Sequence, residues 1–209
     1  MKTEMAQNAL KKKNISLGVI LGSGFLLLHV LYFFNPDCFR EHHLVENLQA
    51  VLLLLTALSC FIRSRQIGWR QYRLFFLGAG IGFVFIFLEE INYGQSIFHI
   101  QSPAFFIKYN VYHEINIHNI VKKQLERIMI AVFILYALFN LYDRNMLRIA
   151  GIPPLDMVKI CIFFGINLGN CLSLILYEKS YVAYYYTELY ELLSYLFFFI
   201  LINIRPSQW

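Results

Sequence analysis

The chain has 209 residues, of which 58% are apolar and 15% are charged, and its mean hydropathy is +0.54. A soluble domain carries about a quarter charged residues, so this chain has too few to cover a water-facing surface. The composition excludes a disordered segment and indicates lipid as the surrounding solvent. The net charge is +5, but the basic residues sit in short clusters at segment ends, which excludes a nucleic-acid-binding face.

Long apolar runs recur along the chain, each near the length of about 20 residues that crosses the roughly 30 Å hydrocarbon layer. They predict an all-α fold: a polytopic membrane helical bundle of about six transmembrane helices, forming a single domain over residues 1–209. All five prolines fall outside these runs, because proline breaks a helical ladder that lipid cannot replace. The predicted spans are Ile15–Phe34, Leu44–Ile62, Leu74–Tyr93, Ile120–Tyr142, Met157–Tyr177 and Leu189–Ile204.

The distribution of charge predicts that both termini are cytoplasmic, since loops rich in Lys and Arg stay on the inner side. Residues 1–14 then form a cytoplasmic tail. The inner segments hold these 12 of the 18 basic residues: Lys2, Lys11, Lys12, Lys13, Arg63, Arg65, Arg70, Arg73, Arg144, Arg148, Lys159 and Arg205. This asymmetry and the absence of a cleavage site predict an uncleaved multi-pass protein of an inner membrane, and the resemblance given below implies a bacterial one.

The outer segment between the third and fourth spans, residues 95–119, is too long for a tight turn. It is also too apolar to float in water, because Phe98, Ile100, Phe105 and Ile107 lie within it. We therefore expect an interfacial or re-entrant segment that contacts membrane lipid.

Acidic and imidazole side chains collect at the outer ends of the predicted spans. An ionisable group inside a membrane costs roughly 2.5–3.5 kcal/mol, so such residues indicate function. Antiparallel packing brings these span ends together, and Glu114 and His118 share a face if their segment is helical. The candidate catalytic residues are Glu89, Glu90, Glu114 and His118, and the candidate substrate-binding residues are Gln95, Asn119, Glu46, Glu188 and Glu191.

Three uses of this predicted outer pocket stay open. A divalent metal could be held by Glu90, Glu114 and His118, since carboxylates with imidazole suit Mn, Fe or Zn. A carboxylate whose pKa is raised by burial and by neighbouring acids could act as a general base without a metal. The acids could also simply form ion pairs with the nearby Lys122, Lys123 and Arg127.

Three predicted spans contain the pattern G-x-x-x-G, which lets helix backbones approach closely. The three pairs are Gly18/Gly22, Gly78/Gly82 and Gly165/Gly169. Packing within the bundle is the expected use, and homo-oligomer formation is the alternative.

The stretch from Glu89 to Gln95, E-E-I-N-Y-G-Q, is followed by Asn110, Glu114, Asn116, His118 and Asn119. This arrangement resembles the pattern E-E-x-x-W/Y-G-Q then N-x-x-x-E-x-N-x-H-N of a group of bacterial multi-pass membrane proteins without assigned activity. A fainter similarity is to the CAAX-type glutamate intramembrane proteases, which place a Glu-Glu pair ahead of essential histidines. Gly94 stands where that family has an arginine, so the second similarity suggests a type of mechanism alone.

Two functions follow as expectations, and the sequence leaves enzymatic activity open. In the first, the pocket hydrolyses or transfers a group on a lipid-linked or membrane-delivered substrate. Glu89 or Glu90 is then the base or metal ligand, Glu114 and His118 complete the site, and Gln95 and Asn119 orient substrate or ligands. In the second, the chain is a non-catalytic membrane subunit: a small pore, a transporter or a scaffold for a partner.

Overall fold

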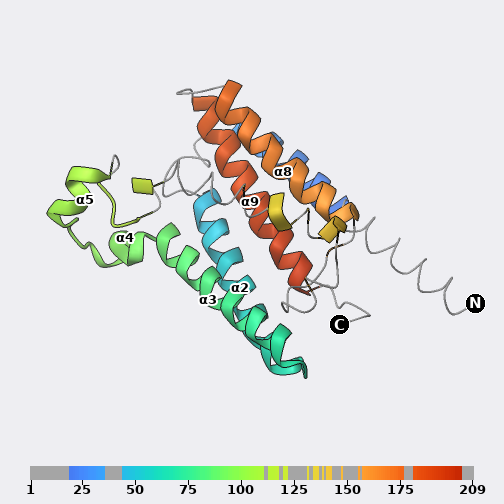
Figure 1. Cartoon of the computed structure of the whole chain (residues 1–209). Helices are drawn as coiled ribbons and strands as arrows, with labels where there is room; N and C mark the ends of the chain where they lie inside the picture. The colour runs from blue at the N-terminus through green and yellow to red at the C-terminus, as the bar shows by residue number, and fades with distance from the viewer. Residues whose placement is uncertain are drawn as a thin grey trace, which may run out of the picture. The chain divides into compact units, whose positions relative to one another are not determined.

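The computed structural model describes residues 19–35, 44–110, 113–117, 120–121, a few positions between 131 and 147, Leu155, and residues 157–176 and 181–203. Regular structure in these parts is entirely helical, as the apolar runs predicted. The helices are Val19–Phe34, α2 (Leu44–Gln66), α3 (Arg70–Glu90), the 3₁₀ turn η2 (Asn92–Gly94), α4 (Gln95–Phe98), α5 (Ala104–Tyr109), α8 (Met157–Leu176) and α9 (Tyr181–Asn203) (Figure 1).

In the described part of the chain, three helices are long and apolar enough to cross a membrane. They are α2, α3 and the part of α9 from Tyr185 to Asn203. Shorter apolar stretches are Val19–Phe34 and Lys159–Gly169. These helices are consistent with a membrane protein, whereas the six-span topology and its orientation stay predictions. Most of the predicted fourth span, Ile120–Tyr142, lies outside the described residues.

The surface of α3 explains why this fold needs lipid. Only 17% of the most apolar 18-residue stretch of this helix is buried within the chain. Large side chains on the helix, among them Leu74 at 57% and Ile81 at 59% exposure, face outward. An apolar surface of this extent would drive aggregation in water, and hydrocarbon is the solvent that accommodates it.

The chain forms two compact units. The first comprises residues 1–49 with 155–205, and the second comprises residues 50–154 with 206–209, so α2 contributes its first turns to one and the rest to the other. The prediction of a single domain over the whole chain is not decided by this division.

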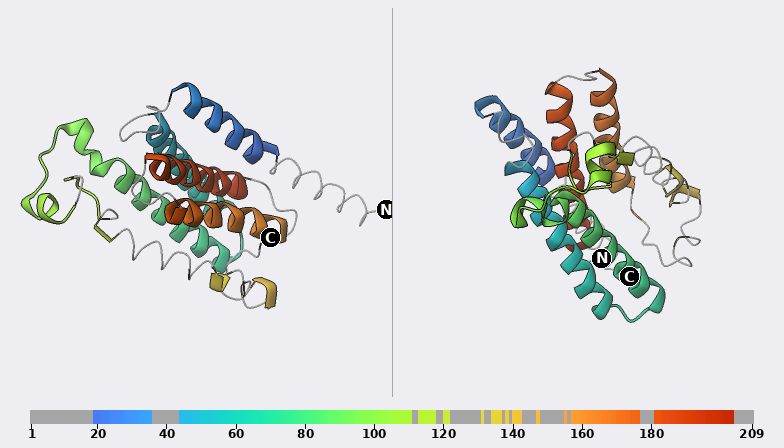
Figure 2. Two further views of the ribbon diagram at one scale, coloured as in Figure 1. Left: turned by 90° about the horizontal axis from the view of Figure 1, so that it is seen from above. Right: turned by 90° about the vertical axis from the view of Figure 1, so that its left-hand side faces the viewer.

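In the first unit, α8 and α9 run side by side (Figures 1 and 2). Phe163 of α8 stacks on Phe197 of α9, with ring centroids 5.2 Å apart. A Cβ atom added to Gly169 would lie 2.5 Å from Cζ of Tyr190, so the absence of a side chain at Gly169 is what lets this ring lie against α8.

In the second unit, α3 packs through a glycine that the sequence analysis did not select. A Cβ atom on Gly80 would lie 2.7 Å from Cε1 of Phe61 in α2, whereas one on Gly78 or Gly82 would meet nothing within 4 Å. The pattern Gly78/Gly82 therefore does not mediate packing within the described part of the chain. Of the Gly165/Gly169 pair, Gly169 has the close neighbour and Gly165 has none within 4 Å.

The contact between Gly169 and Tyr190 predicts opposite effects for two alanine substitutions in α8. Gly169→Ala should lower the free energy of unfolding by about 1–3 kcal/mol, because the new methyl group overlaps the ring of Tyr190. Gly165→Ala should leave it unchanged or raise it by up to about 1 kcal/mol, because alanine favours helix and meets no neighbour. Thermal unfolding of the purified protein in detergent measures both, and equal effects at the two glycines would contradict the predicted packing.

Candidate functional site

The outer segment begins where α3 ends at Glu90. The next residues include Asn92, Tyr93 and Gly94 with φ values of 50°, 52° and 79°, so three consecutive residues adopt the left-handed conformation. Glycine reaches this region freely and asparagine tolerates it, whereas a tyrosine there costs roughly 1–2 kcal/mol. Such a turn persists when its surroundings hold it, and the side chains around it supply that support.

The carboxylate of Glu89 joins this turn to a segment far along the chain. Its Oε1 accepts a hydrogen bond from the hydroxyl of Tyr93, and its Oε2 accepts one at 2.7 Å from the backbone N–H of Ile117. The side chain is 4% exposed, so both bonds form away from bulk water. Hydrogen bonds to a charged acceptor are about twice as strong as neutral ones, and burial makes their loss costly.

Gln95 makes a second tie at the start of α4. Its Oε1 accepts a hydrogen bond at 2.8 Å from the backbone N–H of Ile115, and its Nε2 donates to Oγ of Ser102 at 2.8 Å. The hydroxyl of Ser102 in turn donates to the carbonyl of His113. The amide of Gln95 therefore holds two points, Ser102 and the N–H of Ile115, and through Ser102 it is linked to His113.

Asparagine side chains make further hydrogen bonds next to the loop that contains α4 and α5. Nδ2 of Asn116 donates to Oδ1 of Asn92 at 2.5 Å and to Oε2 of Glu114 at 3.0 Å. Nδ2 of Asn110 donates to Oδ1 of Asn116 at 2.9 Å and to the carbonyl of Glu114 at 2.8 Å. All of these side chains are buried, with Asn116 only 1% exposed. We call this set (Glu89, Asn92, Tyr93, Gln95, Ser102, Asn110, Glu114 and Asn116) the outer polar network.

The outer polar network contains three of the predicted site residues: Glu89, Glu114 and Gln95. Glu90 follows Glu89 on α3 and is half-buried, about 100° further round the helix. His118 and Asn119 lie outside the described residues. Ile117, which donates to Glu89, is the residue immediately before His118.

The other predicted acids lie in the first unit. Nε2 of Gln49 donates to the carbonyl oxygen and to Oε2 of Glu188, both at 3.0 Å, and Gln49 is fully buried. Glu46 and Glu191 are half-buried on the same two helices. Because these residues belong to a different unit from the outer polar network, the predicted convergence of all the acids in one pocket stays a prediction.

Metal-ligating groups are not clustered in the described residues. No three His, Cys, Asp or Glu side chains in that part of the chain are arranged to hold a metal ion. The predicted metal set of Glu90, Glu114 and His118 includes a histidine outside it, so the divalent metal stays a prediction.

The phenol of Tyr93 stays protonated at physiological pH and can therefore act as a hydrogen-bond donor. Burial, followed by the hydrogen bond to Glu89 and the charge of that carboxylate, raises the pKa of Tyr93 from 10.0 to about 12. A phenolate beside a carboxylate would place two negative charges together, so the neutral phenol is favoured over the whole physiological range.

Comparison with known proteins identified no relative: no protein-family model, curated protein or solved structure matched the chain.

Several members of the outer polar network are not among the predicted site residues, although Asn92, Tyr93, Asn110 and Asn116 lie in the motif. A cluster of asparagines beside acids was the available signal, because buried amides satisfy carboxylates and backbone groups together. Gln49 carried no comparable signal, since its partner Glu188 lies 139 residues away, and nothing in the sequence marks the single Ser102 as the partner of Gln95.

The network predicts a large effect from one nearly isosteric change. Asn116→Asp replaces an amide donor that serves Asn92 and Glu114 with a carboxylate that can only accept. We expect the free energy of unfolding to fall by about 2–4 kcal/mol, because two hydrogen bonds are lost and a further buried charge joins those of Glu89 and Glu114. The matched amide-to-acid change Gln66→Glu, at an exposed residue at the end of α2, should alter it by less than about 0.5 kcal/mol. Unfolding in detergent at neutral pH measures both, and similar values would argue against the network.

Tyr93→Phe should remove the hydrogen bond to Glu89 and cost about 1.5–3 kcal/mol at neutral pH. Because the pKa of Tyr93 is raised from 10.0 to about 12 in the folded protein, its contribution is fully present below about pH 10 and is lost as the pH rises to about 12. The difference in unfolding free energy between the wild type and the variant, measured against pH, should therefore vanish only in that window. A difference that disappears below pH 9 would contradict the assignment.

Proposed function

We propose that the outer polar network is part of an acid–base site that hydrolyses or transfers a group on a lipid-linked or membrane-delivered substrate. The proposal rests on the buried carboxylate of Glu89, which accepts hydrogen bonds from the hydroxyl of Tyr93 and from the backbone N–H of Ile117, the residue before His118. In this proposal the chain is a multi-pass protein of a bacterial inner membrane with the network on the outer side.

Glu89 acts as the general base in this proposal. Each carboxylate oxygen has two lone pairs, so an oxygen that accepts one bond from the protein can accept another from water or a substrate hydroxyl. Glu89 takes the proton of that group, whose oxygen then forms the bond to the transferred group. His118 returns a proton to the departing oxygen or nitrogen, and Glu114 holds the segment between them.

A second candidate is a non-catalytic subunit that presents the outer loop to a partner. It is favoured by the observation that polar side chains of the network satisfy one another, as Gln95 does with Ser102 and Asn116 with Glu114. In that case the carboxylates stabilise the loop and perform no proton transfer.

Glu89→Gln distinguishes the two candidates because it can keep both contacts while removing the charge. Its amide oxygen can accept from Ile117, and its amide N–H₂ can donate to the phenol oxygen of Tyr93, which both donates and accepts. Mass spectrometry of lipids and lipid-linked molecules, in membranes of cells that express each variant, supplies the measurement.

Some lipids or lipid-linked molecules should change in amount when the wild type is expressed. We expect the amounts of the same molecules to stay unchanged when Glu89→Gln is expressed, because this variant lacks the base. Arg65→Gln is the control, because it removes an exposed charge from the last turn of α2. If folded Glu89→Gln changes the same species as the wild type, proton transfer by Glu89 is wrong and the non-catalytic candidate gains support. Metal analysis of the wild type and of His118→Ala tests the divalent metal separately.

A further inference from the structure

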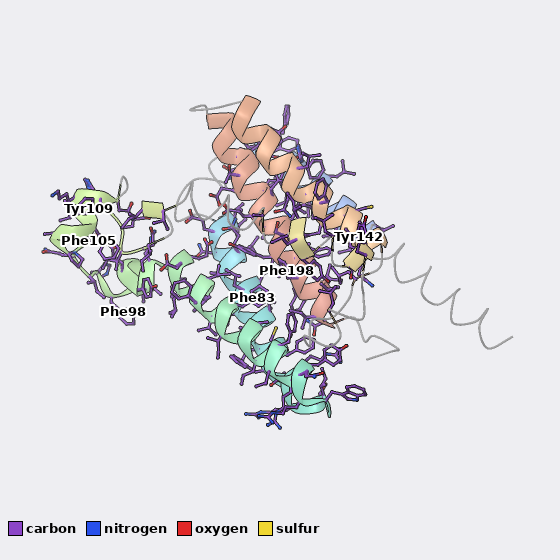
Figure 3. The ribbon with its side chains drawn as sticks, viewed as in Figure 1. Phe83, Phe98, Phe105, Tyr109, Tyr142 and Phe198 are labelled. Carbon is purple, nitrogen blue, oxygen red and sulfur yellow. The ribbon has the colours of Figure 1, made fainter. Side chains whose placement is uncertain are left out.

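The loop that contains α4 and α5 turns large apolar side chains outward. Phe98 is 71% exposed, Ile97 66% and Phe105 57%. Phe98, Phe105 and Tyr109 lie on this loop in Figure 3. We call the exposed apolar side chains of the loop the outer apolar surface; its residues are Ile97, Phe98, Ile100, Phe105, Ile107 and Tyr109.

The outer polar network keeps this surface from folding inward. Gln95 is hydrogen-bonded to Ser102 and to the N–H of Ile115, and Nδ2 of Asn110 donates to the carbonyl of Glu114 at 2.8 Å. These bonds fix both ends of the loop, and the buried side of the loop is already filled by polar groups. The apolar side chains must therefore be covered by something outside the described fold.

Continuity with α3 identifies what covers them. This helix is long and apolar enough to cross the membrane and ends at Glu90, and α4 begins at Gln95. Four intervening residues, three of them in a tight left-handed turn, cannot carry the loop far from the membrane boundary. The six-residue α5 spans about 9 Å, too little to cross the hydrocarbon layer, so the boundary itself is where the loop lies.

The charge on this loop fits a lipid headgroup. Nζ of Lys108 lies 5.0 Å from the ring centroid of Tyr109, and both side chains are exposed. Aromatic rings flanked by a lysine are typical of the headgroup region, where the ring enters the apolar boundary and the ammonium group meets phosphate.

We propose that the outer apolar surface inserts into the headgroup–acyl boundary of the bilayer, and that Lys108 binds the phosphate of anionic lipid there. This surface is independent of any proton transfer by Glu89. For residues 95–109, this proposed position favours an interfacial segment over a re-entrant one.

Fluorescence quenching in vesicles tests the insertion. The two native tryptophans are replaced by phenylalanine, W69F and W209F, and one tryptophan is introduced by Phe98→Trp. The full chain is reconstituted in phosphatidylcholine vesicles in which the acyl chains are brominated either near the headgroup or near the chain end. Ile81→Trp on the exposed face of α3 is the matched deep reference.

We expect the tryptophan at 98 to be quenched several-fold more by the shallow bromine than by the deep one, with the reverse order at 81. Strong quenching at 98 by deep bromine would overturn the interfacial position in favour of re-entry. Absence of quenching by either lipid would overturn membrane contact altogether. In that case, quenching by aqueous acrylamide would indicate exposure to water, and protection from it would indicate a protein partner or a second copy.

The role of Lys108 is tested in the same vesicles. Replacing part of the phosphatidylcholine with phosphatidylglycerol should increase shallow quenching at 98 in the protein that retains Lys108, and Lys108→Gln should abolish the increase. An equal response in both proteins, or no response in either, would overturn phosphate binding by Lys108 while leaving the insertion result intact.

Discussion

The order of the outer segment depends on one buried carboxylate. Glu89 is nearly inaccessible to water, which for an ionised group is unfavourable unless donors replace the lost hydration. The hydroxyl of Tyr93 and the N–H of Ile117 supply them. The first donor is local and stabilises the turn after α3, and the second comes from a segment 28 residues later. A single side chain thus joins the end of α3, a helix long and apolar enough to cross a membrane, to a segment much later in the chain.

The left-handed turn leads directly into the polar network around this carboxylate. The backbone at Asn92 to Gly94 leaves the α-helical path, so its amide and carbonyl groups lose their α-helical partners. Two bonds within the turn replace some of them, because the N–H of Gly94 donates to the carbonyl of Ile91 and the N–H of Gln95 donates to the carbonyl of Asn92. The side chain of Gln95 then donates to Ser102, whose hydroxyl donates to the carbonyl of His113, so the residue after the turn also orders the apolar loop beyond it. The turn and the polar network are two results of one chain reversal.

Hydropathy was sufficient to predict the helices α2 and α3 to within a few residues, because lipid imposes a minimum apolar length on any span. It placed the sixth span at Leu189, whereas α9 already begins at Tyr181, since the tyrosines there lower the apolar score without opposing helix. The carboxylates Glu89 and Glu114 were found because burying charge is costly and hence conspicuous. The hydrogen bond from the backbone N–H of Ile117 to Glu89 could not be predicted from the sequence, because every residue except proline has such a donor. Likewise, the choice of Gly80 over Gly78 depends on where the ring of Phe61 falls, which only packing decides.

The chemistry of position 89 argues for more than a structural contact. A glutamine could make both of the observed hydrogen bonds as a neutral group, and it would avoid most of the cost of burying a charge. The acid therefore costs more to bury than the amide and gives stronger hydrogen bonds in return, and proton exchange is a use that only the acid has. The hydroxyl of Tyr93 and the backbone N–H of Ile117 both donate hydrogen bonds to the carboxylate. These donors stabilise negative charge on Glu89 next to Ile117, the residue that precedes His118. In the proposed acid–base site this carboxylate would both hold the loop and exchange a proton, a combination in which stability is given up for function.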